Sequence, residues 1–152
     1  MLHGLVSHGD SAEALRYIED IAPVQTASDD DGGDIHPLLR AVIEALRSDL
    51  AALGAAFSAD IDLHTPPDDD LMLVITNLCR NAGEAGAARV RLQLVETDHA
   101  VHGTVDDDGA GIDPSQRSQI FALGFSSKPD RSGAGRGIGL NLVRRIVTDR
   151  GG

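Results

Sequence analysis

Hydrophobic residues recur along this chain with two spacings, which predict where helices and strands form. Between residues 37 and 54 they return every three or four positions, so we expect an amphipathic helix, with Pro37 in its first turn. Two more helices are expected over residues 71–85 and about 137–150. Their apolar faces comprise Leu39, Val42, Leu46, Leu50 and Leu53 in the first helix, Leu71, Val74, Ile75, Leu78 and Ala82 in the second, and Ile138, Leu142, Val143, Ile146 and Val147 in the third.

Strict alternation of apolar and polar residues marks the predicted strands. Val90, Leu92 and Leu94 alternate with arginine and glutamine, so residues 90–94 form a strand with one buried face. Residues 101–105 are expected to be its partner and to run directly into a cluster of aspartates. Residues 56–63 are a further candidate strand.

The first 34 residues differ from the rest of the chain. Residues 1–22 are predicted to be helical, with a break near Gly9 and a new start capped by Asp10 or Ser11. Residues 28–34 (SDDDGGD) are polar, rich in charge and contain glycine, which is typical of a linker. The folded domain is therefore expected to begin near residue 35.

Composition and charge narrow the kind of ligand. The 152 residues suffice for one domain, and 24 acidic against 13 basic residues give a net charge of −11, which disfavours nucleic acid. Residues 128–150 are locally basic, however, which suits a small phosphorylated ligand. No apolar run approaches the roughly 20 residues of a membrane span, so we expect no membrane contact by this part of the protein. The single cysteine, Cys79, fits a reducing compartment.

Asp107 is the candidate for reading a nucleotide base. It follows a predicted strand and precedes Gly109 and Gly111. A carboxylate there can accept a hydrogen bond from the exocyclic amine of adenine, whereas guanine presents a carbonyl, so adenine would be selected. The glycines would let the backbone approach the ring. Taken alone, this motif also fits an acidic turn between two strands.

Two asparagines at helical spacing are the candidates for the phosphate and metal end of the site. Asn77 and Asn81 lie four residues apart on the flank of an apolar helix face, where they would be half-buried. The amide oxygen of Asn81 is a hard ligand of the type that magnesium accepts while it also holds phosphates and water. Either asparagine alone could equally be a solvated residue.

A glycine-rich segment before the last helix completes the candidate site. Exposed amide groups at a helix start attract phosphate, and Lys128 and Arg136 can add positive charge. Phe121 and Phe125 flank a polar stretch that suits a loop closing over a ligand, and residues 126–136 are predicted to be mobile without one. Taken singly, the segment also fits a flexible loop, and the phenylalanines fit an ordinary core.

Four segments, NLCRNAGEA, DDGAGI, FALGFSSK and GAGRGIGL, thus follow one another between residues 77 and 140. As a set they resemble the N, G1, F and G2 boxes of the catalytic ATP-binding domain of two-component sensor histidine kinases, in the Bergerat-fold (GHKL) ATPase superfamily. The resemblance covers residues 35–152. It implies an α+β fold, a two-layer α/β sandwich with helices on one face of a mixed sheet, preceded by a short helical segment.

The resemblance also implies ligands and roles. ATP and Mg2+ would be bound, with Asn81 coordinating the metal and Asp107 holding the adenine amine. Asn77 and Lys128 would be the catalytic residues, and both would also contact the nucleotide. Gly109, Gly111 and Ile112 would line the base pocket, and the phosphate-binding end would comprise Gly135, Arg136, Gly137, Ile138, Gly139 and Leu140.

Both ends of the chain depart from a complete kinase. Residues 1–27 look like the end of the dimerising helical hairpin of the citrate- or dicarboxylate-sensing and sporulation-phosphotransferase-like subgroup, followed by a linker (28–34) and the ATP-binding domain (35–152). In that subgroup the phosphate-accepting histidine lies further upstream, and neither His3 nor His8 matches its motif. After Gly152 the family continues into further strands, so we expect an incomplete sheet with an exposed edge.

Asn77 discriminates among functions. Gyrase-like and chaperone-like ATPases of the superfamily carry a glutamate there, which can take a proton from attacking water, whereas an amide cannot. We therefore expect a protein-histidine kinase that transfers a phosphoryl group from ATP to a histidine outside this chain, for relay to an aspartate of a response-regulator receiver domain. A non-catalytic adaptor and an anti-sigma-type serine kinase remain open.

The same resemblance sets the expected context. The parent protein would form a homodimer through the helical hairpin, and this fragment would not autophosphorylate by itself. The domain would be cytoplasmic, in a parent protein that can be anchored in the membrane.

Overall fold

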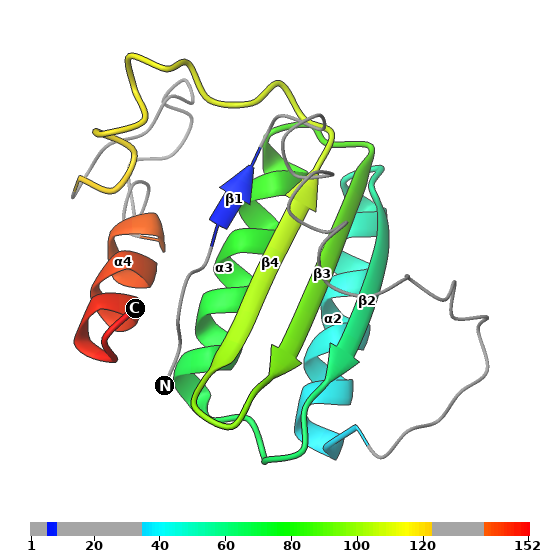
Figure 1. The fold of residues 1–152 in the computed structure, drawn as a ribbon. Helices are drawn as coiled ribbons and strands as arrows, with labels where there is room; N and C mark the ends of the chain where they lie inside the picture. Colours follow the sequence, from blue (N-terminus) through cyan, green and yellow to red (C-terminus); the bar gives the residue numbers. More distant parts are fainter. Residues whose placement is uncertain (1–5, 9–34, 123–138) are drawn as a thin grey trace.

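The computed structural model describes residues 6–8, 35–122 and 139–152, which form a layer of helices against one face of a mixed sheet (Figure 1). Helices α2 (Pro37–Ala52) and α3 (Asp69–Glu84) cover that face. The strands are β1 (Val6–His8), β2 (Ala56–Asp62), β3 (Arg89–Glu96) and β4 (Val101–Asp107). A last helix, α4 (Gly139–Asp149), lies beside α3. The α+β two-layer sandwich predicted from the sequence is confirmed.

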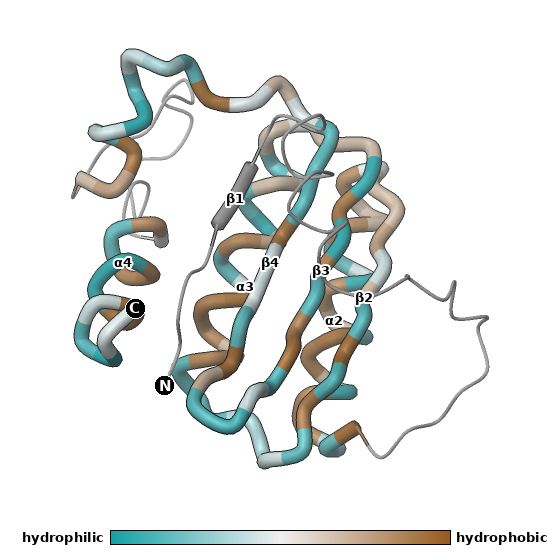
Figure 2. The backbone as a smooth tube through the Cα atoms, viewed as in Figure 1, coloured by the Kyte–Doolittle hydropathy of each residue, from teal (hydrophilic) through white to brown (hydrophobic). Residues whose placement is uncertain are grey.

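Alternating side chains bury one face of the sheet under α2 and α3. Figure 2 shows hydrophobic and hydrophilic positions alternating along β3, where Val90, Leu92 and Leu94 are at most 1% exposed. The largest fully buried helix side chains face them, among them Leu39, Leu46, Leu50, Val74 and Ile75. Burial of this apolar surface is the main term that stabilises the domain.

The strand order β1-β4-β3-β2 makes the sheet mixed. β3 pairs with β4 in antiparallel fashion, whereas β2 runs parallel to β3. Val6–His8 run parallel to β4, opposite Thr104–Asp106, so the prediction of a helix is wrong for these three residues. Pairing with β4 satisfies backbone groups along an edge that would otherwise be open, and this outweighs local helix preference. β4 is therefore paired on both sides over Thr104–Asp106, and the sheet remains open, as expected from the sequence.

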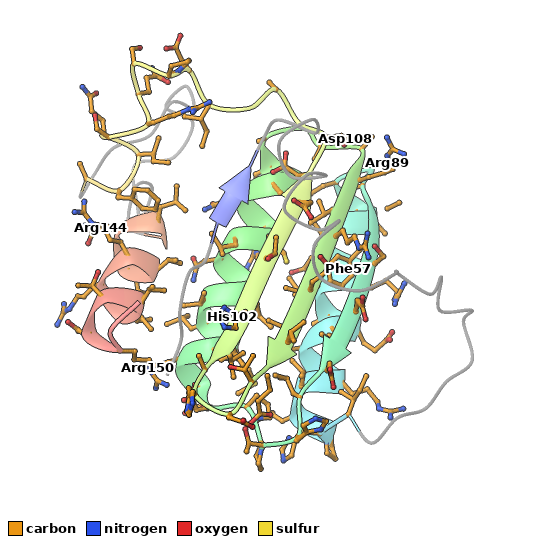
Figure 3. All side chains as sticks on the ribbon, viewed as in Figure 1. Phe57, Arg89, His102, Asp108, Arg144 and Arg150 are labelled. Atoms are coloured by element: carbon orange, nitrogen blue, oxygen red, sulfur yellow. The ribbon has the colours of Figure 1, made fainter. Side chains whose placement is uncertain are left out.

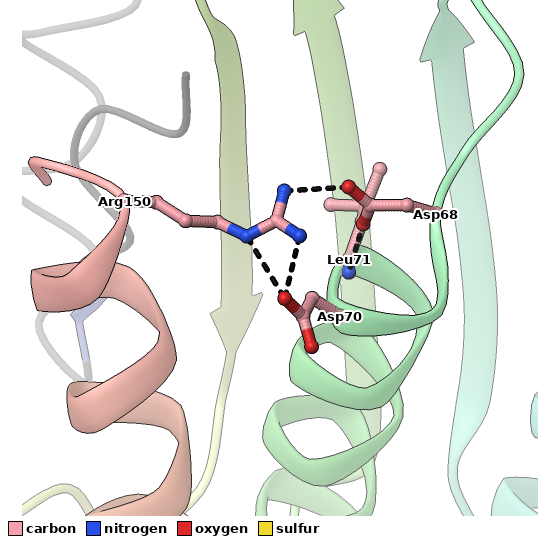
Figure 4. A network of polar contacts seen from close by, with 4 residues as sticks. All are labelled: Asp68, Asp70, Leu71 and Arg150. Carbon is pink, nitrogen blue, oxygen red and sulfur yellow. Dashed lines mark hydrogen bonds and ion pairs between the residues drawn. The ribbon is translucent and has the colours of Figure 1, made fainter.

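Helix α4 is attached to α3 rather than to the sheet. Its C-terminal Arg150 donates to Asp68 and Asp70, at the start of α3, with Nη1 2.5 Å from Asp68 Oδ2 and Nε 2.9 Å from Asp70 Oδ2 (Figure 4). Asp68 is also the N-cap of α3, accepting from Leu71 N–H at 2.9 Å. Since the end of α4 meets the start of α3, the two helices run antiparallel.

Two predictions about burial need correction. Leu53 is half exposed, because α2 ends at Ala52 and the chain turns at Gly54, whose φ is +84°. Of the predicted apolar face of α4, Val143 is buried, whereas Leu142, Ile146 and Val147 are only half-buried. The reason is that α4 packs mainly against one neighbouring helix.

None of the helices in the described ranges combines the length and the hydrophobicity needed to cross a membrane.

Candidate nucleotide-binding site

Asp107 is the last residue of β4 and lies on the helix-covered side of the sheet. It is opposite Val90 in the antiparallel ladder, two residues after Val105, and both valines are 1% exposed. Because side chains alternate along a strand, Asp107 shares their face and follows the last fully buried position of β4. The chain thus places a half-buried carboxylate at the border of the core.

A tight turn after β4 brings the glycine motif against the end of α3. Asp107 Oδ1 accepts from the Gly109 N–H at 2.8 Å, and a Cβ at Gly109 would lie 2.8 Å from the same oxygen. That Cβ would also contact Ala87, whose N–H donates to Ala82 O at the end of α3. A side chain at position 109 would therefore displace the Asp107 carboxylate from this hydrogen bond.

The two asparagines lie where helical spacing predicts, half-buried on the flank of α3. Asn77 Nδ2 donates to Leu73 O at 2.8 Å. Its other amide atom, Oδ1, lies against Gly139, the first residue of α4, where an added Cβ would be only 2.8 Å away. Asn81 is one turn further along α3, next to Ala82 and hence towards the Gly109 turn. The start of α4 therefore lies at Asn77, and the Gly109 turn lies near the C-terminal end of the same helix.

The segment after the turn is also tied to α4. Gly111 has a φ of +71° and Ile112 is half-buried, and the chain then makes a series of turns up to Ala122. At its end the Asn141 side chain donates to Phe121 O at 2.9 Å. Asn141 was not selected from the sequence, because no motif distinguishes it from an ordinary surface asparagine.

Part of the predicted site lies outside the described residues. Lys128, Gly135, Arg136, Gly137 and Ile138 belong to it, as do Phe125 and the predicted mobile stretch at residues 126–136. Of the phosphate-binding end, Gly139 and Leu140 are described, as the first two residues of α4. Burial raises the pKa of the Cys79 thiol to about 12, so this thiol stays protonated at neutral pH.

Asp108 was not selected as a site residue, yet it makes more polar contacts than its neighbours in the motif. Its Oδ1 accepts from the N–H groups of Ala88 and Arg89, both at 2.8 Å, and its Oδ2 accepts from Arg89 Nε at 3.0 Å. The hydrogen bonds from Arg89 are the main cause that lowers the pKa of the Asp108 carboxyl. In Figure 3 Asp108 and Arg89 lie together at one end of the sheet.

Residues 67–152 match the family of Histidine kinase-, DNA gyrase B-, and HSP90-like ATPases. The match includes both asparagines, the Asp107 turn and α4. The chain belongs to this ATPase family. The resemblance inferred from the four segments is thereby confirmed, while the narrower subgroup stays a prediction.

Three relatives of this ATPase domain are named as sensor kinases. Sensor protein kinase CarS of Pseudomonas aeruginosa is 36% identical over 101 residues, covering 66% of this chain and 22% of CarS. Adaptive-response sensory kinase SasA of Synechococcus sp. (strain JA-3-3Ab) is 36% identical over 118 residues, covering 72% and 31%. Virulence sensor histidine kinase PhoQ of Salmonella typhimurium is 31% identical over 121 residues, covering 78% and 24%. The chain thus spans less than a third of the length of these relatives.

A solved structure shares the fold. The mycobacterial sensor histidine kinase MprB superimposes with a TM-score of 0.55 at 25% sequence identity, over 74% of this chain and 79% of the MprB chain. The ATPase domain described here is therefore of the kind found in sensor histidine kinases, and ATP is the ligand expected of its family.

The described residues are compatible with a nucleotide. At Gly109 and Gly139 a side chain would fill space directly beside Asp107 and Asn77, so both positions keep backbone close to a polar group. Among the described residues no three His, Cys, Asp or Glu side chains form a metal-binding group. A magnesium ion at Asn81 would therefore need phosphate and water oxygens for its other ligands.

Proposed function

We propose that this chain binds Mg-ATP and that the γ-phosphoryl group of ATP is transferred to a histidine imidazole on another segment of a sensor kinase. The observation that supports the proposal is the contact of Asn77 with Gly139, which brings the start of α4 against α3 one helical turn before Asn81. The names of CarS, SasA and PhoQ support the assignment to a kinase.

Each site residue has a distinct role in the proposal. Since Gly109 N–H occupies Asp107 Oδ1, we assign the adenine amine to the other oxygen, Oδ2. Asn81 would supply an amide oxygen to Mg2+, which would offset the charge of the phosphates. Gly139 and Leu140 would offer unpaired backbone N–H groups at the start of α4 to phosphate oxygens.

The transfer itself needs positioning rather than covalent catalysis by this domain. A nitrogen of the accepting imidazole would bond to the γ-phosphorus as the bond to the leaving oxygen of ADP breaks, and the ring would lose its proton. Asn77 carries an amide and so cannot act as a base for water. Bound ATP would therefore persist until the histidine arrives. Lys128 would contribute positive charge to the phosphates, as the family resemblance implies.

The wider arrangement is part of the same proposal. Residues 28–34 would be a linker to the ATP-binding domain of residues 35–152. The end of the dimerising hairpin, predicted within residues 1–27, is not proposed for Val6–His8, because these residues pair with β4. The phosphoryl group would pass to an aspartate of a response-regulator receiver domain. The buried thiol of Cys79 and the use of ATP favour a cytoplasmic domain.

Calorimetric titration with ATP, with and without Mg2+, tests the binding step. Asp107→Asn should weaken ATP binding about tenfold or more in both conditions, because it loses a charged hydrogen-bond acceptor. Asn81→Ala should weaken binding only when Mg2+ is present. Asp62→Asn, at the far end of β2, is the control for loss of charge and should bind like the original chain.

Two results would contradict the proposal. Failure of the original chain to bind ATP would favour the non-catalytic adaptor. Steady hydrolysis at about 1 s⁻¹ or faster, typical of dedicated enzymes, would argue against a kinase, since it requires an activated water.

A further inference from the structure

The carboxylate of Asp108 connects the loop before β3 with the turn after β4. Asp108 follows Asp107 directly, and its Oδ1 accepts two backbone N–H groups, those of Ala88 and Arg89, at 2.8 Å each. In return, the Asp108 N–H donates to Arg89 O at 3.3 Å. The loop that leaves α3 and the turn that leaves β4 are thus joined through one side chain.

The loop between α3 and β3 also packs against the Gly109 turn. Ala87, next to Ala88, is 3% exposed and lies 3.7 Å from the position of a Cβ on Gly109. Its N–H donates to Ala82 O, beside Asn81. Ala88 O in turn accepts from Ala56 N at 2.8 Å, which ties the loop to the start of β2 as well. A shift of this loop would therefore move the Asp107 turn.

The ion pair between Arg89 and Asp108 contributes less than the two backbone hydrogen bonds. The Arg89 side chain is 81% exposed, although its Nε lies 3.0 Å from Asp108 Oδ2. Exposed pairs of this kind contribute little, because water and salt screen them. The hydrogen bonds from the two backbone N–H groups of Ala88 and Arg89 are the main restraint.

From these contacts we infer that Asp108 is a positioning residue for adenine selection: it holds the Asp107 turn against the end of α3, so that the Asp107 carboxylate faces the base at a fixed angle. The inference rests on the proposed binding of ATP at Asp107. A hydrogen bond weakens steeply with misalignment, so a loosened turn would lose preference for adenine before it lost its phosphate contacts.

The matched control is a carboxylate at the opposite end of β3, the strand whose first residue, Arg89, contacts Asp108. Glu96, the last residue of β3, accepts from His64 N at 2.6 Å and Thr65 N at 2.9 Å, so it is also a carboxylate that holds two backbone N–H groups. Loss of Glu96 should destabilise the domain in the same manner as loss of Asp108. It should not affect the base, because Asp107 pairs with Val90 near the start of β3.

The experiment measures the ratio of the dissociation constants for ITP and ATP with the 152-residue chain. ITP carries a carbonyl in place of the adenine amine, so the ratio reports the Asp107 hydrogen bond. The original chain should prefer ATP at least about tenfold. Asp108→Ala should reduce that ratio about fivefold or more, whereas Glu96→Ala should leave it unchanged although both variants melt at lower temperature.

Conservative variants separate positioning from charge. Asp108→Asn keeps an oxygen that can accept both N–H groups, so it should preserve the ratio, as should Arg89→Gln. Asp108→Ser can accept one of the two N–H groups and should give an intermediate ratio; it also replaces the alanine variant if that chain does not fold.

The outcomes distinguish the two proposals. If the original chain binds no ATP, the proposed function fails. If it prefers ATP, and folded Asp108→Ala or Asp108→Ser keeps the full preference, the inference about Asp108 is overturned. An equal loss of preference in Glu96→Ala would also overturn it, because the effect would then reflect general destabilisation.

Discussion

Gly139 lies against the side chain of Asn77, so the start of α4 touches the flank of α3. An added Cβ at Gly139 would lie 2.8 Å from Asn77 Oδ1, and the opposite side of that amide donates to Leu73 O. The amide cannot turn away without breaking this hydrogen bond. The glycine is therefore required by a neighbouring side chain and not only by the helix start.

Gly139→Ala should lower the free energy of unfolding by about 1 kcal/mol, although alanine usually favours a helix over glycine. In an Asn77→Ala background the same change should cost nothing or should stabilise, since the opposing oxygen is gone. Urea denaturation of the four chains of this double-mutant cycle gives the coupling energy. Additive effects of the two substitutions would refute the contact.

Helical spacing predicted that Asn77 and Asn81 would be half-buried on the flank of α3, and they are. The glycine motif led to the selection of Asp107, but nothing in the sequence favoured Asp108. Both precede a glycine and both are aspartates, but β-strand alternation sends one towards the core side and leaves the other at the turn, bound to Ala88 and Arg89. That distinction depends on the register of β4 against β3.

At the scale of elements, the orientation of α4 decides where its N-terminus lies. The helix has few buried residues, with Val143 the one fully buried apolar side chain. Polar contacts at its two ends supply further restraint, since Arg150 binds Asp68 and Asp70, and Gly139 meets Asn77. The first of these contacts lies far along α4 from the proposed phosphate site, yet it sets the angle of the helix.

Arg150→Gln should lower the free energy of unfolding by about 1 kcal/mol at pH 7, the scale of a partly exposed ion-pair network, and should weaken ATP binding severalfold. Burial opposes ionisation of Asp68, but hydrogen bonds from Leu71 N–H and Arg150 outweigh it and lower the pKa of this carboxyl below 3.8. Ionised Asp68 therefore stabilises the folded state at pH values above its unfolded-state pKa, and this stabilisation is lost as the pH falls and the carboxyl is protonated. The difference between the two chains should therefore shrink from pH 7 to pH 3 in urea titrations.

Arg145→Gln is the control for this prediction. Arg145 lies on the same helix but pairs only loosely with Asp149, at 4.0 Å, with both side chains more than 70% exposed. Its replacement should change stability by no more than about 0.3 kcal/mol at either pH. If both arginine variants behave alike, the Arg150 contacts do not hold α4 in place.

At the scale of the whole molecule, the proposed ligand would touch three separate elements of the fold. Asn81 comes from α3, Asp107 from the end of β4, and Gly139 from α4, which packs mainly against α3. A nucleotide that bridges them would stabilise the domain as a unit, because it binds the folded state and not the unfolded chain.

Mg-ATP at a hundred times its dissociation constant should therefore raise the free energy of unfolding by about 2.7 kcal/mol. For a domain of this size the expected rise in melting temperature is about 5–10 °C. GTP at the same concentration should give a much smaller shift, and Asp107→Asn should lose most of the ATP response. Equal shifts with ATP and GTP would contradict base reading by Asp107.

The sequence by itself determined the helices from residue 37 onward, the antiparallel strand pair, the half-buried asparagines and the family, because periodicity and short motifs are local properties of the chain. Only the tertiary structure decided that Val6–His8 pair with β4, that α4 packs on α3 with a half-exposed apolar face, and that Asp108 joins the start of β3 to the end of β4. These features depend on which backbone groups and charges meet across long separations in sequence. No local pattern encodes these contacts.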